Sequence, residues 1–430
     1  LKRASFPCKS MPDSFYPNRQ SSRHGKAAIT FFVKPEAKAA ILRETGQPLT
    51  IETITVDDPG PREIRIKTKA CGVCHSDLHM AEGSYPWRYP TVLGHESAGV
   101  VEAVGNQVTD FQVGDTVITC LSVFCGNCEY CLSGKMSLCE SPSRVRGEND
   151  RPRLSQGDME IHQFAQLSSF AERMLVHEHA AVKIREDMPL DKAALIGCGV
   201  TTGVGAVQNT ARIEAGSTVA VIGCGGVGLS AINGAAIAGA SRIVAIDLSA
   251  TKLNLAKEFG ATDLVNPNDG DPVKQVRNLI GGGGVHYAFE AIGLKQTAED
   301  AFRMIRPGGT ATIIGMIPVG TKIELHGPEF LREKKIQGST MGSNRFRVDM
   351  PRYIDFYMQR RLKLDELVSQ HIALEDVNDA FPELFESLDE GKMKELHGHI
   401  EDGKSVDEII KAMKLKSTPD MKKFIKGLMK

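Results

Sequence analysis

Four cysteines crowd into fifteen consecutive residues, CGNCEYCLSGKMSLC. Their spacings are three, three and eight positions, and they are Cys125, Cys128, Cys131 and Cys139. A short loop can wrap four such thiolates tetrahedrally around one Zn²⁺, with bonds of about 2.3 Å. Because four protein ligands leave no position for a substrate, this zinc would be structural. An iron–sulfur cluster is the main alternative, although that pattern places the fourth cysteine sooner, and disulfides are a further one.

A second metal site would have to be assembled from distant parts of the chain. Cys74 lies in ACGVCHSDLHM, His95 in LGHE and Cys198 in LIGCGV, each beside a glycine or within a turn. Two thiolates and one imidazole leave a fourth position for water or substrate, which is the pattern of catalytic zinc. No local spacing shows that the three meet, and a Gly-Cys-Gly is more often a tight turn. We interpret Cys71, at the end of a predicted strand, as a buried thiol outside the site.

A glycine-rich loop directly follows an apolar strand in VAVIGCGGVGLS. Its G-x-G-x-x-G run comprises Gly223, Gly225, Gly226, Val227 and Gly228. Such glycines permit a tight turn, let the backbone approach a pyrophosphate, and allow the next helix to pack closely, with its N-terminus facing the phosphates. Asp247, about twenty residues on, would accept hydrogen bonds from the adenosine ribose and repel a 2′-phosphate. We therefore expect NAD rather than NADP, with a glycine turn in another α/β sheet as the alternative.

The elements that must position these residues follow two patterns. Between about Ala37 and Leu195, short β-prone runs such as EIRIKTKA are separated by Gly, Pro and Asp turns. From Ser217 on, strands such as TVAVIG alternate with helices such as VGLSAINGAAIAGA. Alternation of this kind indicates βαβ units and a parallel sheet covered by helices. The sequence predicts an α/β protein with a β-rich domain and a Rossmann doubly wound coenzyme domain.

The composition is that of an ordinary globular protein, with 430 residues, 41% hydrophobic, 24% charged and a net charge of -1. The length favours more than one domain. The near-neutral charge gives no support to a nucleic-acid partner, and the absence of a run of about twenty apolar residues predicts no membrane span. Clustered cysteines without a secretory segment favour metal binding in a reducing compartment, so we expect a cytoplasmic protein.

The motifs together resemble the zinc-dependent medium-chain alcohol dehydrogenases. The likeness runs from about Lys38 to about Phe385 and comprises GVCHSD, LGHESAGVVEAVG, the four-cysteine lobe, GCGVTTGVGA, GCGGVG and Asp247. It implies two zinc ions per subunit, a catalytic one at Cys74, His95 and Cys198 and a structural one at the lobe. The implied domains are an N-terminal extension at 1–33, a GroES-like catalytic domain at 34–200 with the zinc lobe at 121–140, an NAD-binding Rossmann domain at 201–340, a return to the catalytic domain at 341–390, and a helical tail at 391–430.

The resemblance also implies roles around the catalytic zinc. Ser76 takes the hydroxyl position beside the alcohol, and His79 is the outer end of a proton relay that passes through the nicotinamide ribose. Asp77 and Glu96 lie around the metal, orienting His95 and adding negative charge. Without the resemblance, Ser76 reads as a helix N-cap and His79 as a surface histidine.

Further residues would contact the coenzyme and the substrate. His75 takes a position at the pyrophosphate where the family often has arginine, Thr202 lies near the nicotinamide, and Lys252 lies near the adenosine ribose. The pocket positions hold Trp87, Leu121 and Phe170, which would suit a primary, aromatic or medium-chain alcohol. The segment RLSQGDMEIHQFAQLSSFAE resembles the loop of dimeric members, so we expect a homodimer, with a homotetramer as the alternative.

The expected reaction is the interconversion of an alcohol and its aldehyde by hydride transfer to NAD. One alternative is a formaldehyde-processing relative that acts on a thiol adduct or keeps its nicotinamide bound, in which Arg144 or Arg146 could recognise a thiol carboxylate. A non-enzymatic alternative is a zinc- and nucleotide-binding protein without turnover, which we would expect to lack Cys74, Ser76 or His95.

The two ends of the chain fall outside the resemblance. Residues 1–26 are basic and rich in serine, with Asp13 as their only acid. An organelle transit peptide, a disordered extension and sequence translated upstream of Met11 all fit this composition. After Phe385, the family's usual ending with an arginine near the coenzyme phosphate is not recognisable. The lysine-rich tail has helical spacing, which predicts a solvated helix rather than one on a membrane surface.

Overall fold

The structure is a computed structural model that describes residues 35–147, 149–381 and 404–412. Contacts divide the chain into two units, residues 1–33 and 34–430, and everything below concerns the second. The predicted N-terminal extension lies outside the described residues. The predicted tail lies outside them as well, except for residues 404–412, which contain the helix α12 (Val406–Ala412).

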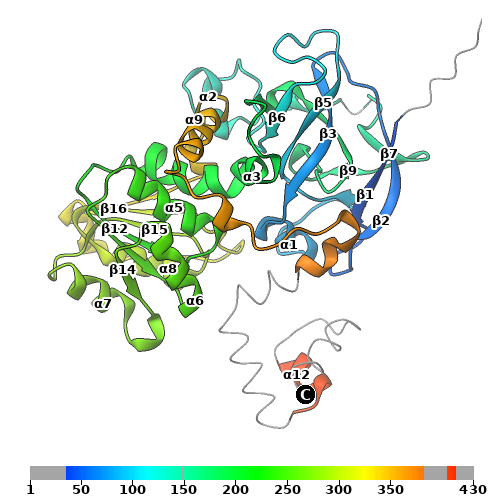
Figure 1. Ribbon diagram of the computed structural model, residues 1–430. Coiled ribbons are helices and arrows are strands. Elements are labelled where there is room, and N and C mark those ends of the chain that lie inside the picture. Colours follow the sequence, from blue (N-terminus) through cyan, green and yellow to red (C-terminus); the bar gives the residue numbers. More distant parts are fainter. Residues whose placement is uncertain (1–34, 148, 382–403, 413–430) are drawn as a thin grey trace, which may run out of the picture. The chain divides into compact units, whose positions relative to one another are not determined.

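Two sheets form the β-rich part of the chain (Figure 1). Their strand orders are β8-β7-β2-β1-β4-β9 and β10-β3-β5-β6-β11. Alternation along β3 places Ile64 and Ile66 in the core and leaves Lys67 exposed, as a sheet with one buried face requires. The strands are β1 (Glu36–Leu42), β2 (Thr50–Val56), β3 (Glu63–Gly72), β4 (Thr91–Val92), β5 (Glu96–Val104), β6 (Thr116–Thr119), β7 (Leu154–Gln156), β8 (Met159–Glu160), β9 (His162–Gln163), β10 (Arg173–His177) and β11 (Ala181–Lys183).

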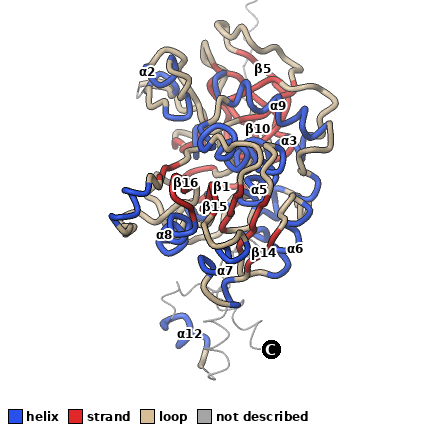
Figure 2. Tube along the Cα trace, turned by 90° about the vertical axis from the view of Figure 1, so that its left-hand side faces the viewer, coloured by secondary structure: helices blue, strands red, loops and turns tan. Residues whose placement is uncertain are grey.

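The third sheet is parallel throughout and has the order β14-β13-β12-β15-β16-β17. Successive residues of its strands face opposite sides of the sheet and pack against two different layers of helices. Val219 and Val221 pack with α5 and α6, whereas Ala220 and Ile222 pack with α7 and α8. Figure 2 shows the strands between α8 on one side and α5 and α6 on the other. The predicted Rossmann sheet and β-rich domain are thereby confirmed.

The strands of this sheet are β12 (Thr218–Ile222), β13 (Arg242–Ile246), β14 (Asp263–Val265), β15 (Val285–Glu290), β16 (Ile305–Ile313) and β17 (Lys335–Gly338). The α-helices are α1 (His75–Glu82), α2 (Glu129–Leu132), α3 (Leu190–Leu195), α4 (Thr201–Gly205), α5 (Gly226–Ile237), α6 (Ala250–Glu258), α7 (Pro272–Leu279), α8 (Lys295–Met304) and α9 (Phe346–Met358). Short 3₁₀ turns cover Met136–Leu138, Pro142–Arg144, Phe164–Gln166, Glu178–Ala180, Pro267–Asp269, Gly327–Arg332, Met341–Ser343, Asp365–Leu367 and Leu374–Asp379.

One helical segment connects the catalytic and coenzyme parts. It runs from α3 through a π turn at Ile196–Val200, α4 and a second π turn at Ala206–Ala211, so it crosses the domain boundary predicted at residue 200. By length and composition Leu190–Ala211 could span a membrane, but 72% of its apolar window is buried inside the protein. Leu190–Ala211 is therefore a core helix, and its π turn carries Cys198.

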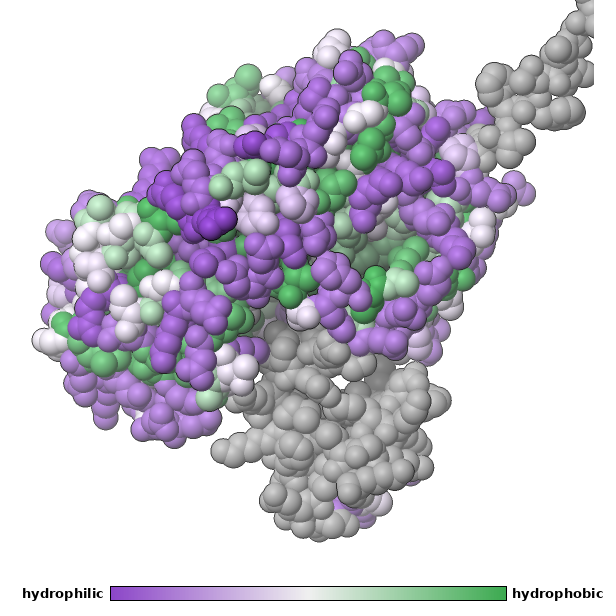
Figure 3. All heavy atoms as spheres, in the orientation of Figure 1, coloured by the Kyte–Doolittle hydropathy of each residue, from purple (hydrophilic) through white to green (hydrophobic). Residues whose placement is uncertain are grey.

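The face in Figure 3 is mainly hydrophilic, with hydrophobic residues in separate patches.

After β17 the chain returns to the β-rich part. Helix α9 packs against β11, and the 3₁₀ turn Leu374–Asp379 packs against β1. Asn378 donates to the Leu49 carbonyl and accepts from the Leu49 amide, both at 2.9 Å. Val377 and Phe381 complete the core of the first sheet. The chain thus closes the catalytic domain with residues that follow the coenzyme domain.

Candidate active site and metal centres

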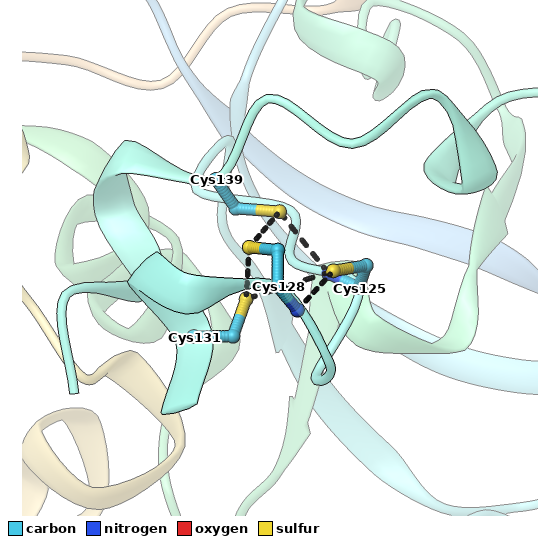
Figure 4. A group of neighbouring side chains, drawn as sticks. All are labelled: Cys125, Cys128, Cys131 and Cys139. Carbon is cyan, nitrogen blue, oxygen red and sulfur yellow. Dashed lines mark hydrogen bonds between the residues drawn. The ribbon is translucent and has the colours of Figure 1, made fainter. Parts of the chain in front are cut away.

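The four cysteines of the lobe point at one another (Figure 4). The Sγ atom of Cys131 lies 3.8 Å from that of Cys125 and 3.5 Å from that of Cys128, and the Sγ atoms of Cys128 and Cys139 are 3.8 Å apart. Sulfurs at the corners of a tetrahedron with bonds of about 2.3 Å would be separated by about 3.8 Å. The side chains therefore have the arrangement that one Zn²⁺ requires.

Backbone amides support this arrangement from within the lobe. The amides of Asn127 and Cys128 donate to Cys125 Sγ at 3.5 and 3.3 Å, and the amide of Cys125 donates to Cys139 Sγ at 3.3 Å. Burial opposes ionisation of Cys125, but hydrogen bonds from these two amides and from the thiols of Cys128 and Cys139 outweigh it and lower the pKa of the Cys125 thiol to about 6. A thiolate is the form that binds zinc, so the donor chemistry fits the metal.

A second cluster brings together the three distant ligands that the sequence left unconnected. Ligand atoms of Cys74, His95, Glu96 and Cys198 all lie within 4.8 Å of one another. Cys74 directly precedes α1, His95 precedes β5, and Cys198 lies in the π turn after α3. His95 and Cys198 are buried and Cys74 is half-buried. The fold thereby places two thiols, one imidazole and one carboxylate around a common point.

Asp77 holds this cluster together. Its Oδ2 accepts from the Cys74 amide at 3.2 Å, and its Oδ1 lies 2.8 Å from the Gly94 amide and 3.2 Å from His95 Nδ1. The carboxylate is wholly buried and fixes the imidazole through Nδ1, as carboxylates behind metal-binding histidines do. Among the described residues His95 Nε2 is buried and has no hydrogen-bond partner. An imidazole nitrogen oriented and unsatisfied in this way fits a metal ion.

The electrostatics of the cluster also suit a cation. A hydrogen bond from Cys198, together with the neighbouring His95, holds the pKa of the Cys74 thiol well below its usual range against the cost of burial. Burial and the negative charge of Cys74 raise the pKa of Glu96 well above its usual range. Glu96 Oε1 accepts from the Gly199 amide at 3.1 Å. We expected Glu96 to stand around the ligands, and the structure places its carboxylate among them.

Helix α1 follows Cys74 and carries Ser76 and His79, the predicted relay residues, and His75, the predicted pyrophosphate contact. Ser76 Oγ lies 3.8 Å from Cys74 Sγ, so its hydroxyl is beside the cluster. The rings of His75 and His79 contact edge to face, with centroids 4.2 Å apart. Burial lowers the pKa of His79, and burial together with His79 lowers the pKa of His75 to about 4. Nδ1 of each ring is buried without a hydrogen-bond partner among the described residues, so both rings are neutral near pH 7.

The glycine loop has the geometry that a dinucleotide requires. Gly223 adopts φ 95° as the chain leaves β12, and a Cβ on Gly228 would approach the Gly223 carbonyl oxygen to 1.8 Å. The third glycine therefore allows α5 to pack on the strand. A Cβ on Gly225 or Gly226 would meet open space, and both are exposed at the start of α5 with the half-buried Val227. This open cradle at a helix N-terminus fits a pyrophosphate.

The predicted coenzyme contacts lie near this cradle. Asp247 follows β13, and its two oxygens accept from the amides of Cys224 and Ser249 at 2.7 and 2.9 Å. Each oxygen keeps a lone pair for a ribose hydroxyl. Lys252 stands half-buried in the first turn of α6. Thr202, on α4, is 8% exposed and places Oγ1 3.3 Å from Met341 Sδ.

The substrate side of the cluster contains an aromatic residue that the sequence did not indicate. The Phe164 ring contacts His95 and Trp87, both edge to face with centroids 5.4 Å apart. Phe170, one of the three residues predicted to line the pocket, lies instead in the core of the first sheet, where it is 3% exposed. Leu121, a second predicted pocket residue, is half-buried between two hydrophobic cores.

The difference between the two phenylalanines lies in the backbone between them. Ala165, Gln166 and Ser168 have φ values of 52°, 62° and 61°. Residues in the left-handed region are uncommon outside glycine and are not predicted by side-chain pattern. They turn the chain so that Phe164 rather than Phe170 lies against His95, which no strand alternation in HQFAQLSSF could reveal.

The two arginines considered for thiol recognition have other partners. Arg146 donates to Glu63 at 2.6 Å and to Asp57 at 2.6 Å, and Arg144 donates to the carbonyls of Ser141 and Val123 at 2.8 and 2.9 Å. Glu63 also binds the buried Arg153 at 2.7 Å. These arginines hold the loop that follows the zinc lobe, so they do not offer a free guanidinium to a substrate.

Comparison with known proteins agrees with this geometry. Residues 60–186 match the family described as "Alcohol dehydrogenase GroES-like domain", and residues 226–358 match "Zinc-binding dehydrogenase". The chain is 40% identical over 357 residues to "Alcohol dehydrogenase class-3" of Zea mays, a match covering 81% of this chain and 94% of that protein.

Solved structures show the same fold. Benzyl alcohol dehydrogenase from Acinetobacter calcoaceticus superposes with a TM-score of 0.77 at 31% identity, covering 82% of this chain and 97% of that one. A zinc-binding dehydrogenase from Sinorhizobium meliloti 1021 bound to NADP has a TM-score of 0.69 at 29% identity, covering 81% and 95%. With these likenesses and the metal and coenzyme sites above, the chain belongs to the zinc-dependent medium-chain alcohol dehydrogenases, as a zinc- and nicotinamide-dependent alcohol oxidoreductase.

Proposed function

We propose that this enzyme interconverts a primary alcohol, aromatic or of medium chain length, and its aldehyde by hydride transfer to NAD. One observation carries the proposal. His95 Nε2, which has no hydrogen-bond partner in the part of the chain that the structure describes, lies among the thiols of Cys74 and Cys198, with the Ser76 hydroxyl beside Cys74. This constellation supplies a place for an alcohol oxygen and a group to accept its proton.

Cys74, His95 and Cys198 would hold a zinc ion, which when bound would supply a Lewis acid for the alcohol oxygen. The nicotinamide ring supplies the hydride acceptor. Ser76 would accept the alcohol proton, and His79, whose pKa burial lowers, would be the outer end of the relay that passes through the nicotinamide ribose to solvent. Asp77 keeps His95 in one orientation, and the four cysteines of the lobe would hold a second, structural zinc.

We assign NAD rather than NADP on the basis of Asp247. Its carboxylate is fixed at the end of β13 by two backbone amides, so it cannot easily turn away from the adenosine ribose. A 2′-phosphate there would meet a negative charge, whereas a free hydroxyl would donate to it. The related Sinorhizobium protein was solved with NADP, so coenzyme choice within these folds depends on such local residues.

The aromatic pair beside the cluster supports an aromatic or other apolar alcohol. Trp87 and Phe164 contact each other, and Phe164 contacts His95, so a substrate at the metal would meet ring faces and edges. The related Acinetobacter protein acts on benzyl alcohol by its name. The thiol-adduct alternative loses Arg144 and Arg146 as recognition groups, because both are bound elsewhere.

An alcohol and aldehyde panel with NAD and NADP, with and without glutathione, tests the proposal. We expect NADH formation from benzyl and medium-chain alcohols, a clear preference for NAD, and no need for glutathione. Turnover of formaldehyde only with glutathione would establish the thiol-adduct alternative. Binding of NAD without turnover of any alcohol would establish the non-enzymatic one.

We also propose that the enzyme is a homodimer formed through the coenzyme sheet. β17 is an edge strand that pairs only with β16 among the described strands. In the segment before it, Leu331 is 89% exposed and Val319 is 76% exposed. The segment borders a hollow of about 370 Å³ whose lining is mainly charged, with Phe302 and Leu325 among such residues as Arg277 and Glu299. Exposed apolar residues beside an open edge are typical of an interface. Light scattering should give twice the subunit mass, and Leu331→Asp should give the monomer.

A further inference from the structure

A loop of the coenzyme domain reaches over to the catalytic residues. The loop follows β16 and contains Met316 and Ile317. Met316 Sδ lies 3.5 Å from Ser76 Oγ, and the Ile317 carbonyl accepts a hydrogen bond from the Tyr85 hydroxyl at 3.1 Å. These contacts join the coenzyme side of the molecule to the segment that carries the predicted relay.

The base of this loop is held by Glu290, whose backbone carbonyl accepts from the amides of Ile314 and Gly315 at 2.8 and 3.1 Å. Glu290, at the end of β15, is wholly buried, and its Oε1 accepts from the amides of Ile292 and Gly293 at 2.9 and 2.7 Å. Gly293 in turn packs so closely on Met316 that a Cβ would lie 2.6 Å from the Met316 carbonyl oxygen. The backbone that leads to the Ile317 carbonyl is therefore held at Ile314, Gly315 and Met316.

Tyr85 contacts the relay with its other side. Its ring meets that of His79 edge to face, with centroids 5.9 Å apart, and the ring of His79 in turn contacts His75. Tyr85 is half-buried against the core of the first sheet. Its hydroxyl therefore points to the coenzyme domain while its ring limits where His79 can lie.

We propose that Tyr85 is a positioning residue of this enzyme, which ties His79 to the coenzyme-side loop at Ile317. The proposal rests on the proposed role of His79 as the end of the proton relay. Coenzymes bind at the carboxyl ends of the strands in this fold, which is where the Ile317 loop begins. Tyr85 thus links the place where the coenzyme lies to the residue that moves the proton.

Tyr89 provides a matched control. It is a second phenol on the same segment, but its hydroxyl accepts from Thr45 Oγ1 at 2.9 Å and donates to the Met80 carbonyl at 3.4 Å. Both partners belong to the catalytic domain. Tyr89→Phe therefore removes the same hydroxyl group, with one donated and one accepted hydrogen bond, without touching the link to the coenzyme domain.

The experiment compares Tyr85→Phe and Tyr89→Phe in the full-length, zinc-loaded enzyme. NADH binding is followed without turnover through Trp87, the single tryptophan of the chain, and benzyl alcohol oxidation with NAD gives kcat and both KM values. Losing one hydrogen bond corresponds to a factor of roughly two to ten. We expect Tyr85→Phe to lower kcat and raise the NADH dissociation constant by such a factor, with the alcohol KM and the melting temperature little changed.

For Tyr89→Phe we expect wild-type kcat and NADH affinity, with only the melting temperature lowered. Wild-type kcat and NADH affinity in Tyr85→Phe would overturn the proposal, as would equal losses in the two variants. If the wild-type enzyme oxidised no alcohol with NAD, the proposed function would fail. NADH binding alone would then test the Tyr85 link. A wild-type NADH dissociation constant in Tyr85→Phe would overturn the link.

Discussion

The two cysteine clusters of this enzyme are built in opposite ways. The lobe draws Cys125, Cys128, Cys131 and Cys139 from one short loop, and amides of that loop also support the sulfurs. The catalytic cluster draws Cys74, His95 and Cys198 from the start of a helix, a strand and a π turn. The first arrangement is local, whereas the second exists only once the catalytic domain has folded.

This difference implies different dependences on the metal. A loop of fifteen residues in which Cys125 and Cys139 are buried and Cys128 and Cys131 half-buried is too short for a core of its own, so zinc must contribute much of its folding free energy. The catalytic cluster is held by the buried Asp77 and by packed sheets, so it persists without metal. Loss of the lobe ligands should therefore affect folding, and loss of the catalytic ligands should affect chemistry.

The largest effect is expected from Cys128→Ser in the lobe. Structural zinc supplies on the order of 10 kcal/mol in small zinc modules, and Cys128 Sγ contacts both Cys131 and Cys139. We expect loss of one zinc, a large fall in melting temperature and a poor yield of soluble enzyme. A variant with wild-type melting temperature would show that the lobe folds without its metal.

Next in size is Cys74→Ser in the catalytic cluster. Removing a ligand of a metal that contributes several kcal/mol to the transition state should lower alcohol oxidation by roughly 10³-fold or more. Because Asp77 and the sheets remain, the melting temperature and NADH affinity should stay near wild type. Calorimetry and NADH titration check this, and unfolding comparable to that of Cys128→Ser would remove the contrast between the clusters.

A smaller effect is expected from Asp77→Asn. The amide keeps an oxygen for the Gly94 amide but loses the charge that faces His95 Nδ1. Residues behind metal ligands typically contribute about 10- to 100-fold in metal affinity or activity, so we expect losses in that range. Chelator competition and kcat/KM measure them.

Asp115→Asn serves as the control for Asp77→Asn. Asp115 is also a buried carboxylate of the catalytic domain, but it pairs with Lys183 at 2.6 Å and lies outside the metal cluster. It should change stability only. Equal losses of metal affinity in both variants would show that Asp77 has no special connection to the metal.

The smallest effect is expected from Cys71→Ser. Cys71 is spaced from Cys74 as a metal-binding pair would be, yet its Sγ contacts Ser169 Oγ at 3.0 Å and lies outside the ligand group. Serine preserves this contact, so both zincs should remain and kcat/KM should stay within about twofold. Loss of the catalytic zinc in this variant would mean that Cys71 takes part in the site.

The parts of the site predicted from sequence are those encoded by spacing. The lobe and the glycine loop with Asp247 are local patterns whose geometry follows from residue order, and the alternation of strands and helices predicted the doubly wound sheet. The meeting of Cys74, His95 and Cys198 was inferred from resemblance, because it depends on long-range strand pairing that no short motif encodes.

The parts that were missed depend on backbone turns and on contacts between domains. Left-handed residues after Phe164 bring that ring, and not Phe170, to His95. The link from Tyr85 to Ile317 joins residues from two domains, and neither residue stands in a recognisable motif. Sequence patterns predict elements and ligand types, whereas such contacts require the assembled fold.

Zinc content measured side by side in three proteins gives the sharpest test of the two metal centres. We predict two zincs per subunit in the wild-type enzyme, one in Cys74→Ser with the fold intact, and two in Cys71→Ser. The zinc that remains in Cys74→Ser should be released only as the lobe unfolds. Two zincs in a folded Cys74→Ser variant that still oxidises alcohols would contradict the assignment of the catalytic centre.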